Sequence, residues 1–386
     1  MKRVLVLDAS QRSALAVTRS LGRQGVPVVT ADESPVALAG CSRHSNQFFL
    51  YPSPRLHPER FVEVLAELVQ SHHIDILLPM TELTTTLLLT HRHDFPDTVM
   101  PFPEMSRVDD LANKCTLMNT AELLGIPVPR TWHIDTPETL TKFRNELPFP
   151  VVLKPGKSWL YYKNEWHRAS VRFPQNSRIL EQLVASEPGF QAHPFMIQEC
   201  VPGEGQGIFA LYDHGKPLVF FAHRRLREKP PRGGVSVLSE SAAADSMLVA
   251  HARALLDHAG WHGIAMVEFK VAPDGTPHLM EVNTRFWGSL QLAIDAGVDF
   301  PCLLFQVASG TTPDPVPDYR TGVRLRWLLG DLDSLYLTMR DRQYPLKKKL
   351  AALMRFLTPA PFKTRHEVNR WNDIRPAWCE LKHYIK

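Results

Sequence analysis

Four polar side chains in the second half of the chain have the types and spacing of ligands for a hard metal ion. Glu281, Asn283 and Arg285 lie two residues apart, so in a β-strand they point to one face of the sheet. Glu268 lies in the apolar segment that precedes them, and residues 273–276 between the two segments indicate a turn. A hairpin would therefore bring Glu268 close to Glu281 and Asn283.

Two carboxylates and an amide oxygen on one surface are ligands that Mg²⁺ accepts, and phosphate and water oxygens usually complete its shell. Arg285 beside such an ion would neutralise a phosphoryl group during its transfer. The alternative is a solvated strand face that carries a surface Glu–Arg pair. The spacing alone leaves both interpretations open.

Two lysines and one strand end complete the set of candidate ligands. Lys154 ends an apolar strand and precedes a Pro-Gly pair, and Lys114 lies on or near a helix that leads into the sequence GIPVP. A lysine in such a place pairs with phosphate as a point charge, although each one alone is more often a surface residue. The strand over 195–200 runs into a turn, where backbone groups could pair with an adenine edge and Glu204 with ribose hydroxyls.

Strands and helices alternate over the first hundred residues, which indicates a small parallel α/β domain. Strands are expected at 4–8, 26–30 and 74–78, and helices at 12–24 and 59–70. Thr81 and Glu82 follow the third strand, at the edge where open parallel sheets bind ligands. Capping of a helix over 83–89 is an equal alternative for them. No G-x-G-x-x-G follows the first strand, which weakens a dinucleotide-binding interpretation.

The rest of the chain mixes helices and strands. Helices are expected at 109–125, 177–187, 243–259 and 290–309, the last interrupted at Gly297. Strands are expected at 150–154, 195–200, 207–212, 217–223, 263–271 and 277–283.

The order of these features resembles the ATP-grasp superfamily of carboxylate ligases over about residues 1–310: Lys114, GIPVP, Lys154, QECVPGE, then E-x12-E-x-N-x-R. Its most specific part is 280–289, and 223–241 is similar to the carbamoyl-phosphate-synthase-like, amino-acid-ligase-like branch. The resemblance implies an α/β chain with an α+β ATP-grasp core. A pre-ATP-grasp domain would span 1–108, the lid 109–195, the core with the metal site 196–315, and a basic, mostly helical extension 316–386.

The resemblance also implies roles for individual residues. ATP would contact Lys114, Lys154, Ser158, Glu199, Cys200, Val201 and Glu204. Mg²⁺, or Mn²⁺ in its place, would bind Glu268, Glu281 and Asn283. Arg285, Arg225 and Arg227 would face the reacting phosphate or the acid. The substrate pocket would include Thr81, Glu82, Gly234 and Ser236.

One segment departs from the family pattern. Many members have a glycine-rich loop after the second lysine, whose amides cradle phosphate. Here residues 155–162 hold one glycine and three aromatic residues, so Lys157 and Ser158 are the candidates for part of that role.

The activity that the resemblance implies has two steps. A small carboxylate attacks the γ-phosphate of ATP to give an acyl phosphate and ADP, and an amine then displaces phosphate. Two other function classes stay open, which are carboxy-phosphate chemistry on bicarbonate and a regulatory ATP-binding protein without ligation. Dimers are common among such relatives, so a homodimer is a further expectation.

Composition limits the class of protein and its location. The 386 residues are 44% hydrophobic and 22% charged, which excludes overall disorder. The five cysteines are scattered, so neither a zinc motif nor a disulfide framework is indicated. The first apolar run stops at Asp8, too short for a signal peptide, and no run reaches the length of a membrane helix. We therefore expect a cytoplasmic protein.

The basic charge is concentrated at the end of the chain. Residues 339–386 hold 12 Lys or Arg and 4 Asp or Glu, whereas the net charge of the whole chain is only +4. A basic amphipathic segment with Trp371 and Trp378 either packs on the body, which we favour, or lies on an anionic membrane. Nucleic-acid binding is not expected, because no recognised module accompanies the charge.

Overall fold

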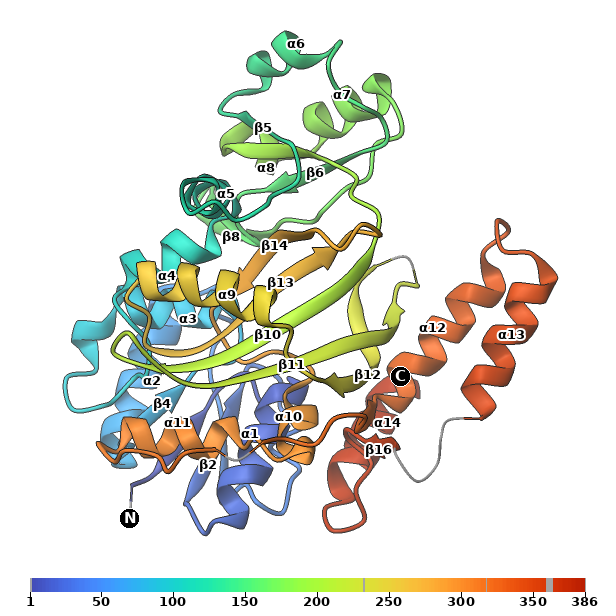
Figure 1. Cartoon of the computed structure of the whole chain (residues 1–386). Helices are drawn as coiled ribbons and strands as arrows, with labels where there is room; N and C mark the ends of the chain where they lie inside the picture. The colour runs from blue at the N-terminus through green and yellow to red at the C-terminus, as the bar shows by residue number, and fades with distance from the viewer. Residues whose placement is uncertain (1, 232, 317, 359–363, 386) are drawn as a thin grey trace.

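A computed structural model describes residues 2–231, 233–316, 318–358 and 364–385. Its parts are arranged in tiers (Figure 1). The N-terminal α/β domain lies at the bottom of the view, a large sheet crosses the middle, and the small part predicted to be the lid lies at the top. The C-terminal helices extend to the right. A mixed α/β architecture was predicted from the sequence, and it is confirmed.

The N-terminal domain is built on a parallel sheet in the order β3-β2-β1-β4. Its strands are β1 (Val4–Val6), β2 (Val28–Asp32), β3 (Gln47–Leu50) and β4 (Ile76–Leu78). Its helices are α1 (Arg12–Arg23), α2 (Pro58–Ser71), α3 (Glu82–Thr90) and the short 3-10 turn η1 (Arg92–Asp94). The strands β2 and β3 are added on one side of β1, and β4 is added on the other side. The carboxyl ends of β1 and β4 therefore meet at the topological switch point of the sheet, where such sheets bind ligands.

The expected helix over 109–125 is wrong as a single element. The structure has two helices, α4 (Met105–Ala112) and α5 (Lys114–Leu123). Asn113 separates them and caps α5, because its Oδ1 accepts a hydrogen bond from the Cys115 N–H at 3.0 Å. The break has a consequence for the site, because it makes Lys114 the first residue of α5.

The lid is a three-stranded antiparallel sheet with its own small core. Its strands follow the order β5-β9-β6, with β5 (Thr131–Ile134), β6 (Val151–Pro155) and β9 (Phe195–Glu199). Its helical elements are η2 (Pro137–Thr139), α6 (Leu140–Phe143), α7 (Ser177–Ser186) and α8 (Pro188–Ala192). A separate hairpin, β7 (Trp159–Tyr162) and β8 (Glu165–Arg168), follows β6 directly.

The central sheet has seven strands in the order β14-β13-β10-β11-β12-β15-β16. They are β10 (Glu204–Asp213), β11 (Lys216–Lys229), β12 (Val235–Ala242), β13 (Gly263–Val271), β14 (Pro277–Asn283), β15 (Arg324–Arg326) and β16 (Thr364–His366). Helix α9 (Ser246–His258) packs on this sheet, and α10 (Leu290–Ala296) and α11 (Phe300–Ala308) pack between it and α1. Gly297 ends α10 in a left-handed conformation, φ 118°, at the predicted interruption.

The C-terminal segment contributes both to the sheet and to the surface. Strands β15 and β16 extend the central sheet beyond β12. Helices α12 (Leu328–Arg340), α13 (Leu346–Leu357) and α14 (Arg375–Ile385) follow. A buried ion pair between Arg19 Nε and Asp373 Oδ2, 2.8 Å apart, fixes this segment to the N-terminal domain. The part of the segment around Asp373 therefore packs on the body as expected, whereas Trp371 is 96% exposed. The proposed boundary at residue 316 stays a prediction.

No single helix among the described residues has the length and apolar composition needed to cross a membrane. The bent pair α10 and α11, at 96° to each other, meets that criterion only when the two helices are taken together.

Candidate active site

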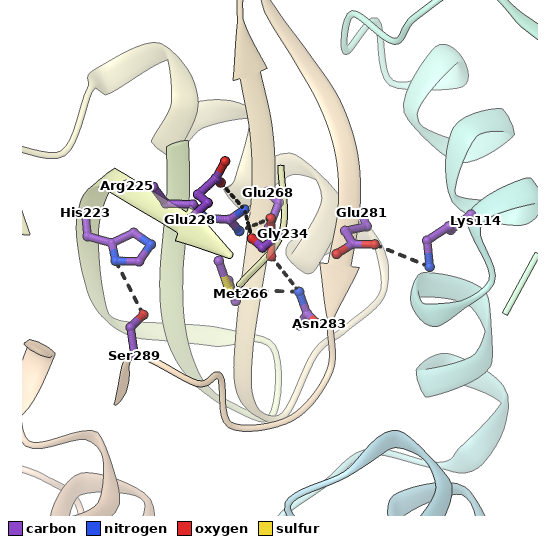
Figure 2. A network of polar contacts seen from close by, with 10 residues as sticks. All are labelled: Lys114, His223, Arg225, Glu228, Gly234, Met266, Glu268, Glu281, Asn283 and Ser289. Atoms are coloured by element: carbon purple, nitrogen blue, oxygen red, sulfur yellow. Dashed lines mark hydrogen bonds and ion pairs between the residues drawn. The ribbon is translucent and has the colours of Figure 1, made fainter. Parts of the chain in front are cut away.

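The two strands that carry the predicted metal ligands form an antiparallel hairpin. Glu268 on β13 lies directly opposite Glu281 on β14, and Met280 is an extra residue at a bulge beside them. Asn283 Nδ2 donates a hydrogen bond to Glu268 Oε1 at 2.9 Å. The three predicted metal ligands are therefore neighbours on one surface (Figure 2).

Glu268 is held by an arginine that crosses an intervening strand. Arg225 on β11 forms an ion pair with Glu268 on β13, and β10 lies between these two strands. At the crossing β10 has Gly205 and Gly207, so no side chain stands between the two charges. Burial raises the pKa of Glu268, and the Arg225 guanidinium only partly offsets it.

Lys114 occupies a place that a helix alone would not favour. It is the first residue of α5, where the helix dipole disfavours a cation. Its Nζ lies 3.3 Å from Glu281 Oε2 (Figure 2). Burial alone would lower the pKa of Lys114, but the Glu281, Glu82 and Glu268 carboxylates outweigh burial and raise it. The carboxylate cluster therefore explains why this buried lysine is charged.

Lys154 on β6 approaches the same carboxylate from the lid. Burial lowers the pKa of Lys154 to about 8, because attraction to Glu281 only partly offsets the loss of solvent and Lys114 repels it. Burial would raise the pKa of Glu281, but the two lysines outweigh burial and lower it. The Glu281 carboxylate is thus stabilised by two buried cations.

Arg285 and Arg225 bring further positive charge to this surface. Arg285 follows β14, donates a hydrogen bond from Nη1 to the Phe286 carbonyl at 2.9 Å, and lies close enough to Glu268 to lower its pKa. Arg225 also pairs with Glu228 at 3.2 Å. Four cations, counting the two lysines, therefore gather with four carboxylates, those of Glu82, Glu228, Glu268 and Glu281. The cations of this balanced cluster suit a phosphate chain.

Arg227 does not share this surface, contrary to expectation. Spacing by two predicts that Arg225 and Arg227 point the same way. A bulge at Leu226 inserts one residue, so Arg225 pairs with Ser239 and Arg227 with Leu238. Arg227 therefore points to the opposite face. There it binds Asp331 of α12, with an Nη2–Oδ2 distance of 2.6 Å.

Gly234 and Ser236 lie beside Arg225. The Gly234 carbonyl accepts a hydrogen bond from Arg225 Nη1 at 3.4 Å. A Cβ atom at Gly234 would lie 2.2 Å from the Lys229 carbonyl oxygen, so only glycine fits. The Ser236 hydroxyl is buried and has no hydrogen-bond partner among the described residues, which leaves it available to a ligand.

The segment expected to contact adenine lines a pocket of about 390 Å³. Its walls are Glu199, Cys200 and Val201 together with the β13–β14 turn and His278. The Glu199 carboxylate already accepts a hydrogen bond from the Arg130 N–H at 3.0 Å, which leaves backbone groups and Cys200 facing the pocket. Glu204 is exposed at the start of β10.

Thr81, Glu82 and Ser158 lie where the N-terminal domain meets the lid. Thr81 caps α3, because its hydroxyl accepts a hydrogen bond from the Thr84 N–H. The helix-cap alternative therefore accounts for its side chain. Glu82 Oε1 accepts a hydrogen bond from the Ser158 N–H at 3.1 Å, which joins a predicted substrate residue to a predicted phosphate residue.

Sequence reasoning missed several members of the site. Glu228 was missed because its contact with Arg225 depends on the pairing of β11. Gly205 and Gly207 were also missed, although glycines within a strand are a visible signal that other groups approach its backbone closely. His223 lies buried behind the cluster, and burial lowers its pKa to about 3. Its Nδ1 lies 3.4 Å from Ser289 Oγ (Figure 2).

A family model described as ATP-grasp in the biosynthetic pathway with Ter operon matches residues 191–330. That range holds the β13–β14 hairpin and Arg225. The chain has the ATP-grasp fold. The resemblance predicted from the sequence is thereby confirmed. No curated protein matches the chain in sequence.

Solved structures support the same fold. L-amino acid ligase from Bacillus licheniformis is 17% identical, covers 80% of this chain and 74% of its own, and has a TM-score of 0.64. Biotin carboxylase from Campylobacter jejuni, solved as a β,γ-ATP complex, is 13% identical, with coverage of 83% and 74% and a TM-score of 0.65. N5-carboxyaminoimidazole synthetase from Staphylococcus aureus is 13% identical, with coverage of 84% and 80% and a TM-score of 0.61.

The chain has a hairpin at the place where the family resemblance predicted a glycine-rich loop. β7 and β8 turn at Lys163 and Asn164, both with positive φ. Positive φ at both central residues is the geometry of a type I′ turn. Asn164, which lies between two aromatic segments, is a residue type that favours this turn and could have indicated the hairpin. The preceding loop is fixed to α4, because Lys157 Nζ lies 2.5 Å from Asp109 Oδ1.

Proposed function

We propose that this chain is an ATP-dependent ligase. It would activate a small, amino-acid-like carboxylate as an acyl phosphate for attack by an amine, with release of ADP and phosphate. The observation that carries the proposal is the single cluster in which Glu268, Glu281 and Asn283 meet Lys114 and Lys154. Its two adjacent carboxylates suit the cation of a metal–nucleotide complex, and its lysines suit the phosphates.

The donor set fits Mg²⁺, with Mn²⁺ as an alternative. Glu268 and Glu281 lie opposite each other, and burial raises the pKa of Glu268, so a cation between them would relieve the cost of the buried charge. Glu268, Glu281 and Asn283 would hold the ion through oxygen atoms. When bound, it would supply charge neutralisation at phosphate oxygens.

The remaining ATP contacts follow from the same arrangement. Lys114 and Lys154, which neutralise Glu281 in the free chain, are proposed to contact phosphate oxygens. The 390 Å³ pocket beside Glu199–Val201 suits adenine, and exposed Glu204 lies beyond it for ribose. The solved β,γ-ATP complex of biotin carboxylase belongs to a chain of this fold, which supports nucleotide binding.

In this reaction the protein has to position the reactants and neutralise their charge, and no protein nucleophile is needed. Arg285 and Arg225 are proposed to stabilise the phosphoryl group during transfer to the carboxylate. Glu82, at the switch point of the N-terminal sheet, and Ser236, with its free hydroxyl, are proposed to hold the substrates. The lid loop with Ser158 would exclude water from the acyl phosphate.

Carboxy-phosphate chemistry on bicarbonate is the second candidate. One chain of this fold, a 2-oxoglutarate carboxylase domain, was solved with MgADP and bicarbonate. Its TM-score of 0.64 equals that of the amino acid ligase, so the fold does not rank the two chemistries. A regulatory protein without ligation is less favoured, because the whole cluster of ligands and cations is intact.

The test is ADP and phosphate release from Mg-ATP with amino acids and small acids, singly and in pairs, and with bicarbonate. Arg285→Ala is run beside the wild type. We expect release that requires one particular pair and is lost in the variant. Release that needs only bicarbonate would replace the first candidate by the second. Tight ATP binding without turnover under any condition would contradict both.

A further inference from the structure

Helix α13 exposes its apolar side chains instead of burying them. Among the residues that the structure describes, it is a 12-residue helix with no buried side chain. Leu346, Leu350, Met354 and Leu357 are 70%, 51%, 58% and 63% exposed. Spacings of four, four and three residues place them on one face of the helix. We call these four residues the α13 stripe.

The opposite face of α13 is already attached to the body. The Arg326 guanidinium lies 4.3 Å above the Phe356 ring, and Arg326 Nη2 donates to the Phe356 carbonyl at 3.0 Å. Arg227 Nη1 donates to the Arg355 carbonyl at 3.3 Å. The α12–α13 hairpin extends from the side of the molecule (Figure 1). Because these contacts fix the helix, the stripe cannot turn inward without breaking them.

Lysines border the stripe. Lys347, Lys348, Lys349 and Arg355 give α13 four cations, and the helix has no acidic residue. At about 100° per residue, Lys347 and Lys349 lie on opposite sides of the stripe. Neither lysine has an ion-pair partner among the described residues, and Lys348 lies 4.0 Å above the Tyr344 ring. An apolar face with lysines on both sides is the arrangement of a helix that lies flat in a membrane interface.

We propose that the α13 stripe docks on the surface of an anionic lipid bilayer. The stripe would insert among the upper acyl chains, while Lys347 and Lys349 would extend along their stems to lipid phosphates. Two copies of this face would bring like charges together, so a symmetric dimer through α13 is disfavoured. α12 adds further exposed apolar side chains at Leu332, Tyr336 and Met339. The proposal does not depend on the ligase activity.

Vesicle flotation with the full chain tests this directly. Vesicles of phosphatidylcholine alone are compared with vesicles that also contain phosphatidylserine. The double variant Leu350→Glu/Met354→Glu removes the centre of the stripe. Its matched control is Leu56→Glu/Leu123→Glu, at leucines that are 50% and 86% exposed outside the C-terminal helices. Thermal melting confirms that every variant is folded.

We expect the wild type and the matched control to float with the anionic vesicles, and the stripe variant to lose partitioning by more than about tenfold. Lys347→Gln/Lys349→Gln should lose most of the difference between anionic and neutral vesicles. Equal flotation of the stripe variant and the wild type, or no flotation of the wild type, would overturn the proposal. A wild-type dimer that the stripe variant converts to monomer would overturn it in favour of a second copy.

Discussion

Two hairpins in this chain depart from the usual distribution of residues in opposite directions. The β13–β14 hairpin holds two carboxylates, half-buried Glu268 and Glu281, against two buried lysines. The α12–α13 hairpin exposes apolar side chains such as Leu346 and Leu357 to solvent. Proteins rarely bury charge without compensation or expose contiguous apolar surface.

The difference shows what kind of partner each region requires. Opposite charges gathered on one surface indicate a small ionic ligand, such as a metal–nucleotide complex, that can take over part of their pairing. An uncovered apolar stripe bordered by lysines indicates an extended surface. The first partner should therefore affect turnover, and the second should affect only where the protein resides. Variants that separate these two outcomes test the comparison.

The largest effect is expected when a carboxylate of the β13–β14 hairpin is neutralised. Glu281→Gln should lower ADP release by on the order of 100-fold or more, because even outer-shell partners of a metal ligand are worth about 10–100-fold. Glu240→Gln is the matched control on the same sheet, where Glu240 binds Arg224 and Arg324 outside the cluster. Equal loss in both variants would mean that any buried glutamate matters, which would contradict the proposed site.

Variants at Arg225 and Arg227 compare the two faces of β11. Arg225→Met should lower turnover by on the order of 100-fold, because it removes a charge at the proposed phosphoryl site. Arg227→Met should leave turnover per folded molecule unchanged and lower the free energy of unfolding by about 1–3 kcal/mol, because it removes a charged hydrogen bond to buried Asp331. Steady-state kinetics and urea unfolding measure the two. The reverse pattern would contradict the bulge at Leu226.

The two lysines should respond oppositely in stability and alike in ATP binding. Burial lowers the pKa of Lys154 from 10.5 to about 8, so at pH 7 its charge costs about 3 kcal/mol of folding free energy. Lys154→Met should therefore stabilise the chain, whereas Lys114→Met should destabilise it, because the pKa of Lys114 is raised. Each variant should weaken ATP binding by about 10–100-fold. Destabilisation by Lys154→Met would contradict this assignment.

The smallest effect is a pH dependence of ATP binding. The charged form of Lys154 binds phosphate, and that form is lost as pH rises through about 8. ATP affinity should then fall by up to about tenfold per pH unit above 8. Lys154→Met should remove this dependence. Titration calorimetry between pH 7 and 9 measures it, and an unchanged slope in the variant would assign the dependence to another group.

Much of the fold around the site could be predicted because its signals are local. The bounds of β13 and β14 follow from alternating apolar residues with a turn between them, and they placed Glu268 beside Glu281. The family resemblance extended this to ATP-grasp topology. The split at Asn113 was missed, although an Asn cap is a local signal.

Other features depend on contacts between distant segments. The bulge at Leu226 arises from how β11 pairs with β12, so spacing alone misplaced Arg227. The joining of β15 to β12 depends on strand pairing across more than eighty residues, and that of β16 to β15 across forty. The exposure of the α13 stripe could not be read from its sequence, because the same pattern also describes a helix that buries one face.

The most direct test of the central claim is calorimetric titration of ATP into the wild type and Glu281→Gln, each with and without Mg²⁺. The account predicts that Mg²⁺ strengthens ATP binding to the wild type and that Glu281→Gln loses most of this strengthening while staying folded. ATP binding to the wild type that does not respond to Mg²⁺, or an undiminished response in Glu281→Gln, would contradict the claim that the β13–β14 hairpin holds a metal–nucleotide complex.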